Sequence, residues 1–208
     1  ANYELQPQLN IESFLLKYDQ PIMSLELSAK LRAWLLKNNH HAGILTNRPN
    51  STPPEFISAP EAELGAKLVG MEDYPILGSA MLSWYAETQC ALPQHTFLKP
   101  NAVHALGLMQ ICLGQSPGEA ISRAVELWHE NNSFISHWQP LQGADVLIFE
   151  DSIKGLQSGM NAKRLLKRID ININLKCIGV TDNPIKKRAL LDITDEVIPT
   201  INHYRWAV

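Results

Sequence analysis

Two adjacent carboxylates, Glu150 and Asp151, stand where an apolar run gives way to a helical pattern. The run 145–149 predicts a buried strand, and Ser152 is suited to cap the helix that follows, in which glycines allow close packing. In open α/β sheets, ligands bind at the carboxyl ends of the strands. Hard oxygen ligands at that edge suit Mg²⁺, which takes a few carboxylates together with water and phosphate oxygens. The alternative is a capped helix with two solvated acids.

Two further positions could contact a phosphate. Thr46 ends a short apolar run, where its hydroxyl and the backbone N–H of Asn47 could hold a phosphate oxygen. Lys99 stands immediately before Pro100, where its ammonium could neutralise a phosphate and lie beside the carboxylates. Each residue alone also fits an ordinary role, since strand-ending threonines are commonly structural and a lysine before a proline commonly lies on the surface.

Taken in order, these pieces resemble the second, third and fourth motifs of the haloacid dehalogenase superfamily. The matching stretches are Ile44-Leu45-Thr46-Asn47, then Leu98-Lys99-Pro100, then Ile148-Phe149-Glu150-Asp151-Ser152. The stretch 177–183 also fits the strand and loop that commonly follow the fourth motif. The resemblance extends in pieces from about Ser24 to Ile201, and the fourth motif contributes most of it.

The resemblance implies a role for each matching residue. Thr46 and Asn47 would bind the substrate phosphoryl group, and Lys99 would neutralise it. Glu150 and Asp151 would hold Mg²⁺, with Asp151 as the preferred direct ligand. Members of this superfamily attack phosphate with an aspartate and hydrolyse the resulting aspartyl-phosphate, which is covalent catalysis supported by the metal and the lysine.

The family's first motif, an apolar strand that ends in Asp-x-Asp followed by glycine, has no recognisable copy before Thr46. The closest candidate nucleophile is Asp19, where Pro21 replaces the second acid. The same region also carries Ile11, Phe14, Leu15 and Tyr18 at helical spacing, which favours a helix that ends before Pro21. Three accounts remain open: the chain is part of a longer enzyme, a relative that has lost turnover, or an enzyme with a displaced nucleophile at Asp19.

Loss of the family's central strand would also leave neighbouring strands without backbone partners. Some other segment would then have to fill the gap. The N-terminal Tyr3-Glu4-Leu5, a second copy of the chain or a partner chain are the candidates.

The elements that must position these residues alternate between amphipathic helices and short apolar runs, which favours a mainly parallel sheet covered by helices. We therefore predict an α/β fold, a three-layer Rossmann-like sandwich with helical inserts. The whole of residues 1–208 would form one domain, with insert segments at about 50–95 and 102–140. Predicted helices lie at 24–37, within 61–89, at 103–111, at 121–128 and after Ser152; predicted strands lie at 42–46, 145–149, 176–180 and 196–198, with 97–100 extended.

The overall composition and charge of the chain argue against several classes of protein. The 208 residues are 45% hydrophobic, which is enough for a real core. A net charge of −3 gives no general attraction to nucleic acid or to anionic membranes, and the apolar runs are too short to cross a bilayer. The three cysteines, Cys90, Cys112 and Cys177, are scattered, which predicts free thiols in a reducing, cytoplasmic setting.

Together the motifs predict a Mg²⁺-dependent phosphatase-type hydrolase of a small phosphate ester, impaired by the missing nucleophile motif. The alternative is a non-catalytic protein of the same fold that binds a phosphorylated ligand or a partner protein. Specificity in this family resides largely in caps and inserts, so the motifs do not identify the ester.

Overall fold

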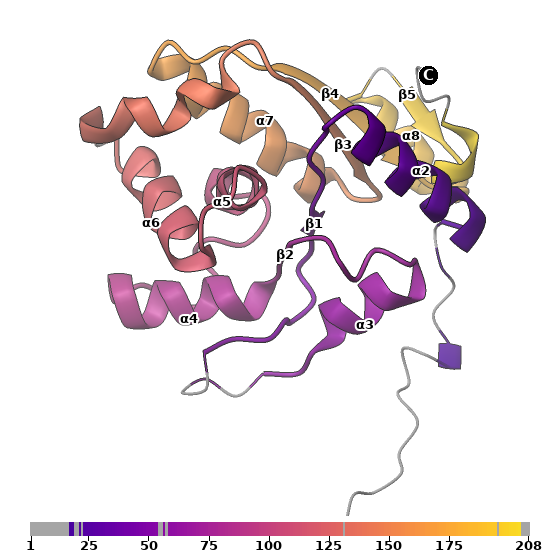
Figure 1. Ribbon diagram of the computed structural model, residues 1–208, viewed down its shortest axis with the longest axis horizontal. Helices are drawn as coiled ribbons and strands as arrows, with labels where there is room; N and C mark the ends of the chain where they lie inside the picture. Colours follow the sequence, from indigo (N-terminus) through magenta and orange to yellow (C-terminus); the bar gives the residue numbers. More distant parts are fainter. Residues whose placement is uncertain are drawn as a thin grey trace, which may run out of the picture.

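The computed structural model describes residues 17–18, 21, 23–53, 56, 58–130, 132–194 and 196–204, and they form a mixed α/β fold (Figure 1). Two small parallel sheets are present among them. The first pairs β1 (Ile44–Leu45) with β2 (Ile76–Leu77). The second has the order β3 (Asp145–Glu150), β4 (Asn174–Val180), β5 (Glu196–Ile198). In this second sheet Phe149 pairs with Ile178, and Ile178 with Glu196.

Helices connect the strands, and five of the described α-helices begin at a side-chain cap. Ser24, Asn101, Ser116, Ser152 and Asn183 each accept a hydrogen bond from a backbone N–H in the first turn of the helix that follows. None of the described helices combines the length and apolar composition that crossing a bilayer requires. The helices are α2 (Leu25–Lys37), α3 (Glu61–Leu68), α4 (Ser79–Cys90), α5 (Ala102–Cys112), α6 (Pro117–Trp128), α7 (Ile153–Arg168) and α8 (Pro184–Leu191), with 3-10 helices η1 (Asn132–Leu141) and η2 (Ile201–His203).

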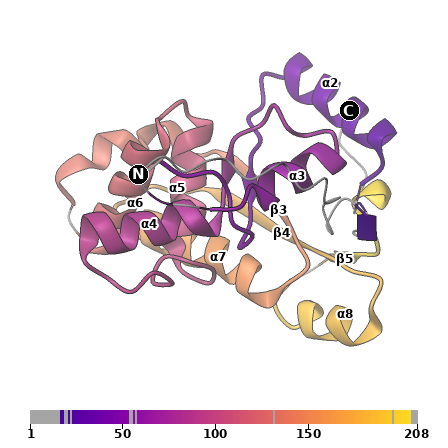
Figure 2. The same cartoon turned by 90° about the horizontal axis from the view of Figure 1, so that it is seen from below.

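The larger hydrophobic core surrounds α5, which lies among α4, α6 and α7 (Figures 1 and 2). Val103 and Leu106 of α5, Ile121 of α6 and Leu166 of α7 are all fully buried. Because α5 is apolar on nearly every side, it can be covered all round, and Leu77 of β2 and Val146 of β3 pack into the same cluster.

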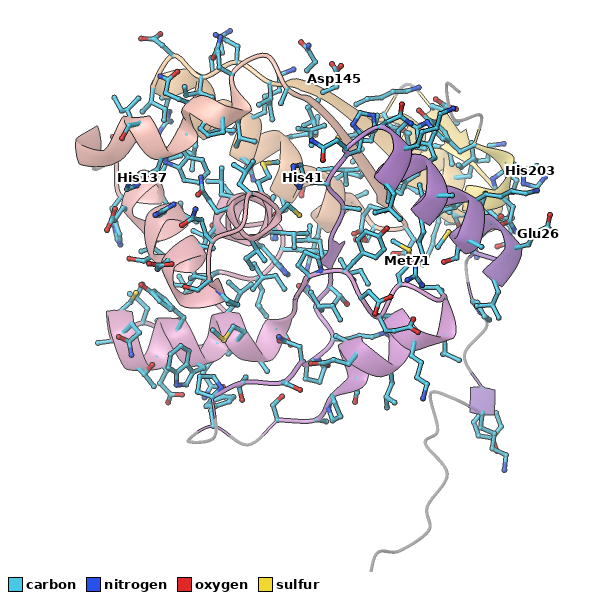
Figure 3. The ribbon with its side chains drawn as sticks, viewed as in Figure 1. Glu26, His41, Met71, His137, Asp145 and His203 are labelled. Atoms are coloured by element: carbon cyan, nitrogen blue, oxygen red, sulfur yellow. The ribbon has the colours of Figure 1, made fainter. Side chains whose placement is uncertain are left out.

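A smaller core lies on the other side of the strands. It contains Met71, which follows α3 (Figure 3). Ile178 of β4 and Ile198 of β5 belong to the same cluster. Leu27 and Leu31 of α2 pack against it. Helix α2 therefore packs against part of this side of the strands.

Most predicted elements are confirmed, but three expectations were wrong. The stretch 61–89 contains two helices, α3 and α4, and between them the strand β2, which was not predicted. Residues 97–100 form turns rather than an extended segment. In α7 the spacing of Ile153, Leu156 and Met160 predicts that all three face the sheet, yet Ile153 and Met160 are 38% and 39% exposed. Gly155 and Gly159 form the buried face instead, together with Leu156, because the absence of a Cβ lets β3 approach closely.

Candidate functional site

Glu150 ends β3 and is held in place by the start of α7. The Ser152 hydroxyl accepts the Gly155 N–H at 3.1 Å, which caps the helix, and it donates to Glu150 Oε1 at 2.7 Å. A Cβ added to Gly155 would lie 2.0 Å from Cδ of Glu150. Any side chain at this position would therefore force the Glu150 carboxylate to move away from its present partners.

Lys99 forms an ion pair with this carboxylate. Its Nζ donates to Glu150 Oε2 at 2.6 Å and to the backbone carbonyl of Leu45 at 2.9 Å. The two side chains are only 7% and 11% exposed. Since Leu45 ends β1 and Glu150 ends β3, one ammonium group joins the carboxyl ends of strands from the two sheets. At this burial each charge depends on the other, because an unpaired ion in the interior is costly.

Polar contacts from α7 hold the turn that carries Lys99. The Ser158 hydroxyl donates to the carbonyl of Asn101 at 2.7 Å, and Asn161 Nδ2 donates to the carbonyl of Pro100 at 2.9 Å. The Asn101 side chain also caps α5 and donates to the carbonyl of Thr96. The lysine and its carboxylate partner are thus positioned by the same helix.

Asp151 lies on the solvent side of this pair. Its Oδ2 accepts a hydrogen bond from Lys186 Nζ at 3.0 Å, and the two side chains are 61% and 55% exposed. Partial burial raises the pKa of Asp151. The hydrogen bond and positive charge of Lys186, together with smaller effects of a hydrogen bond with Glu150 and the charge of Lys99, lower it, and the net pKa lies below the ordinary value for an aspartate. Lys186 belongs to α8, which Asn183 caps just after β4.

Thr46 follows directly after the carbonyl that Lys99 contacts. Its side chain is half-buried, and its Oγ1 accepts the backbone N–H of Arg48 at 3.1 Å. Its own N–H donates to the carbonyl of Leu77, the last residue of β2. The hydroxyl keeps its hydrogen as a donor in this arrangement, while Asn47 is exposed at the turn that follows.

The structure therefore brings together Lys99, Glu150 and the end of β1 before Thr46, with Asp151 adjacent on the outside. The candidate nucleophile Asp19 and the candidate filler Tyr3–Leu5 lie outside the described residues. Of the residues that hold Lys99, sequence reasoning missed Ser158 and Asn161. Their only sequence signal is that two polar side chains lie near the buried glycines of α7.

His104 is a second buried polar group near the site. It is fully buried in α5, and its Nε2 lies 2.9 Å from the carbonyl oxygen of Leu77. Burial lowers the pKa of His104 to about 3, and the charge of Lys99 contributes in the same direction. The ring is therefore neutral at ordinary pH, and it joins α5 to the end of β2.

Glu150 and Asp151 fit a Mg²⁺ ion that keeps several waters better than a metal site in which the protein supplies every ligand. Among the described residues no three His, Cys, Asp or Glu side chains cluster as metal ligands. Both oxygens of Glu150 already have partners, Lys99 and Ser152. The exposed carboxylate of Asp151 has the hard oxygen donors that Mg²⁺ prefers, and this ion commonly keeps several waters when a protein supplies one or two carboxylates.

Comparison with models of known protein families, with curated proteins and with solved structures finds no match to this chain.

Proposed function

We propose that this chain carries the phosphate-binding side of a haloacid dehalogenase-like, phosphatase-type hydrolase that acts on a small phosphate ester with Mg²⁺. In this proposal the strands belong to one three-layer, Rossmann-like sandwich, and the protein works in the cytoplasm. The single observation that supports it best is the buried Lys99 ammonium, held between the carboxyl end of β1 and Glu150 at the end of β3.

A buried ammonium at this edge suits phosphate chemistry. It is a fixed positive charge in a site with little water, where charge–charge interactions are stronger than in bulk solvent. The turn at Thr46 supplies a hydroxyl donor next to it, on the same strand end. Asp151 would hold the metal on the solvent side, and bound Mg²⁺ would polarise the phosphoryl oxygen there.

The roles of the chain's own residues follow from these positions. Lys99 would neutralise the phosphoryl oxygens, Thr46 and Asn47 would orient them, and Glu150 with Ser152 would keep the ammonium in place. Asp19 is the candidate nucleophile within this sequence, and without an acid in that role the chain would bind phosphate but turn it over slowly.

A second candidate is a non-catalytic protein that binds a phosphorylated ligand or a partner protein. One observation favours it: each of the two acids at this edge is already neutralised by a lysine, Glu150 by Lys99 and Asp151 by Lys186. A bound phosphate group could then replace one of these carboxylates as the partner of its lysine, without any chemical reaction.

Mg²⁺-dependent hydrolysis of p-nitrophenyl phosphate and a panel of small phosphate esters separates the two candidates. The assay compares the wild type with Asp151→Asn and with the control Asp170→Asn. Asp170 is exposed at the opposite end of the strands, and its positive φ of 61° is well tolerated by asparagine. Binding of inorganic phosphate and of Mg²⁺ is measured by calorimetry on the same proteins.

Turnover that depends on Mg²⁺ and is lost in Asp151→Asn, but not in Asp170→Asn, supports the hydrolase. Asp19→Asn then tests the nucleophile, because the residue is required only if it forms the covalent intermediate. Phosphate binding without turnover supports the binder. If neither turnover nor phosphate binding occurs, the phosphate site itself is refuted.

A further inference from the structure

Lys186 is a positively charged residue beside the site to which the proposed function gives no role. Its Nζ donates to Asp151 Oδ2 at 3.0 Å, and the two side chains are 55% and 61% exposed. An ion pair in such contact with water contributes little stability, because both charges stay hydrated and a long side chain must give up conformational freedom. Lys186 can therefore exchange Asp151 for another anion at small cost.

The backbone that carries Lys186 is held in place at both ends of α8. At the start of the helix, the side-chain oxygen of Asn183 accepts the N–H groups of Ile185 and Lys186 at 2.9 and 3.1 Å. Near its end, Leu190 is buried, and a Cβ added to Gly179 of β4 would lie 3.2 Å from the Cβ of Leu190. The first-turn N–H groups are thus already capped, so an anion here would be bound by the lysine side chain.

The two lysines of the site pair with consecutive carboxylates. Lys99 contacts Glu150 and Lys186 contacts Asp151, and the Cα atoms of neighbouring residues are about 3.8 Å apart. The first pair is buried and the second is exposed, so one ammonium lies inside the protein and the other lies at its surface. A small molecule with two anionic groups can therefore contact both ammonium groups, one with each end.

The metal ion of the proposed function would leave Lys186 in need of a new partner. Among the residues that the structure describes, Asp151 is the only acid paired with Lys186. Once Asp151 holds a divalent cation, the ammonium group of Lys186 lies beside a like charge and has lost its carboxylate. A negative group supplied by the substrate would restore a favourable interaction at this position.

We propose that Lys186 determines specificity by binding a second anionic group, a carboxylate or a second phosphate, on the phosphate ester whose first phosphate lies at Lys99. The substrates of this site are then small esters with two separate negative groups. The inference rests on the phosphate site proposed above, and it applies to the hydrolase and to the non-catalytic binder alike.

The neighbouring lysine provides a matched control. Lys187 follows in the same turn of α8 and is also exposed. Successive residues of a helix point about 100° apart, and Lys186 is the one that contacts Asp151. Removal of Lys187 therefore changes the net charge of the protein as much as removal of Lys186 does, without removing the proposed contact.

Calorimetric titration of the complete chain in the presence of Mg²⁺ tests the inference. The probes are ethyl phosphate, phosphoglycolate and ethylene glycol bisphosphate, which carry one phosphate ester on a two-carbon unit and have, respectively, no second charge, a carboxylate and a second phosphate. The proteins are the wild type, Lys186→Met, Lys186→Arg and the control Lys187→Met. The urea midpoint of each variant verifies that it is folded.

In the wild type, at least one of the two doubly anionic probes should bind about fivefold more tightly than ethyl phosphate, the upper range for an exposed ion pair. The probe with the larger advantage identifies the second group as a carboxylate or as a phosphate. Lys186→Met should abolish the advantage and leave the affinity for ethyl phosphate unchanged. Lys186→Arg and Lys187→Met should retain it, since both keep a cation at position 186.

Equal binding of the three probes by the wild type would overturn the inference while the phosphate site stands. An equal loss of the advantage in Lys186→Met and Lys187→Met would also overturn it, because the effect would then be one of net charge. If none of the probes binds, ethyl phosphate included, the phosphate site itself fails and the inference fails with it.

Discussion

Replacement of Lys99 by methionine removes the ammonium from the buried ion pair but keeps most of the side chain's length. Glu150 would then remain 11% exposed with only the Ser152 hydroxyl as a partner, and the Leu45 carbonyl would lose its lysine donor. Removal of one partner from a buried pair costs about 3–5 kcal/mol. Because the serine contact remains, we expect the lower end, about 3 kcal/mol of unfolding free energy.

Urea unfolding followed by tryptophan fluorescence measures this cost. With a denaturant slope of about 2 kcal/mol per molar, the midpoint should fall by about 1.5 M. The matched control is Lys30→Met, since Lys30 forms a 2.7 Å pair with Glu26 but the side chains are 70% and 79% exposed. In water such a pair contributes little, so this control should leave the midpoint unchanged.

A double variant separates charge from packing. Lys99→Met with Glu150→Gln removes both charges, so it should recover at least half of the stability that the single variant loses. The reasoning is refuted if Lys99→Met costs no more than Lys30→Met, or if the double variant is less stable than the single one.

Three further predictions concern neighbouring groups. Gly155→Ala should destabilise the protein and weaken phosphate binding, because the new Cβ would collide with the carboxylate of Glu150 at the end of β3. The control Gly65→Ala in α3 places its Cβ more than 4 Å from any atom beyond the neighbouring helix backbone, so it should stabilise the protein by about 1 kcal/mol. Urea midpoints measure the stability of both variants, and calorimetry measures their phosphate binding. His104 has a folded-state pKa of about 3 against about 6.5 unfolded, so the unfolded chain binds more protons between these values. Stability should fall by up to about 1.4 kcal/mol per pH unit as pH falls through this window, and His104→Gln should remove that slope in urea titrations at several pH values. Lys186→Met should raise the pKa of Asp151 towards its ordinary value, which a carboxyl NMR titration measures. In the wild type the lowered pKa stabilises the folded protein above the ordinary pKa of an aspartate, and this stabilisation is lost as pH falls through the lowered pKa; the variant should lack it. An unchanged pKa in the variant would contradict the assigned cause.

Local patterns predicted the part of the site that is built from consecutive residues. The strand β3, the two acids and the capping Ser152 follow one another within a few positions, so periodicity and capping rules are enough to place them. The placement of Lys99 depends instead on Ser158 and Asn161, whose contacts with its turn span 57 and 61 positions. No spacing rule encodes pairings over that distance.

The parts of the fold that sequence patterns failed to predict are mainly short elements. The strand β2 is only Ile76–Leu77, with Pro75 before it and Gly78 after it, so it shows no periodicity. Its position is set by pairing with β1 and by burial of Leu77 against α5. The finer arrangement of the two sheets likewise depends on contacts between distant segments.

The four charges at the carboxyl ends of the strands form two pairs of opposite sign. Lys99 lies against Glu150 and Lys186 against Asp151, so the group sums to zero. An approaching dianion would therefore feel little attraction until it is within contact distance, and diffusional encounter would gain nothing from long-range steering. Association of phosphate with this edge should then proceed at nearly the same rate in dilute and in concentrated salt, unlike capture by an open cluster of lysines.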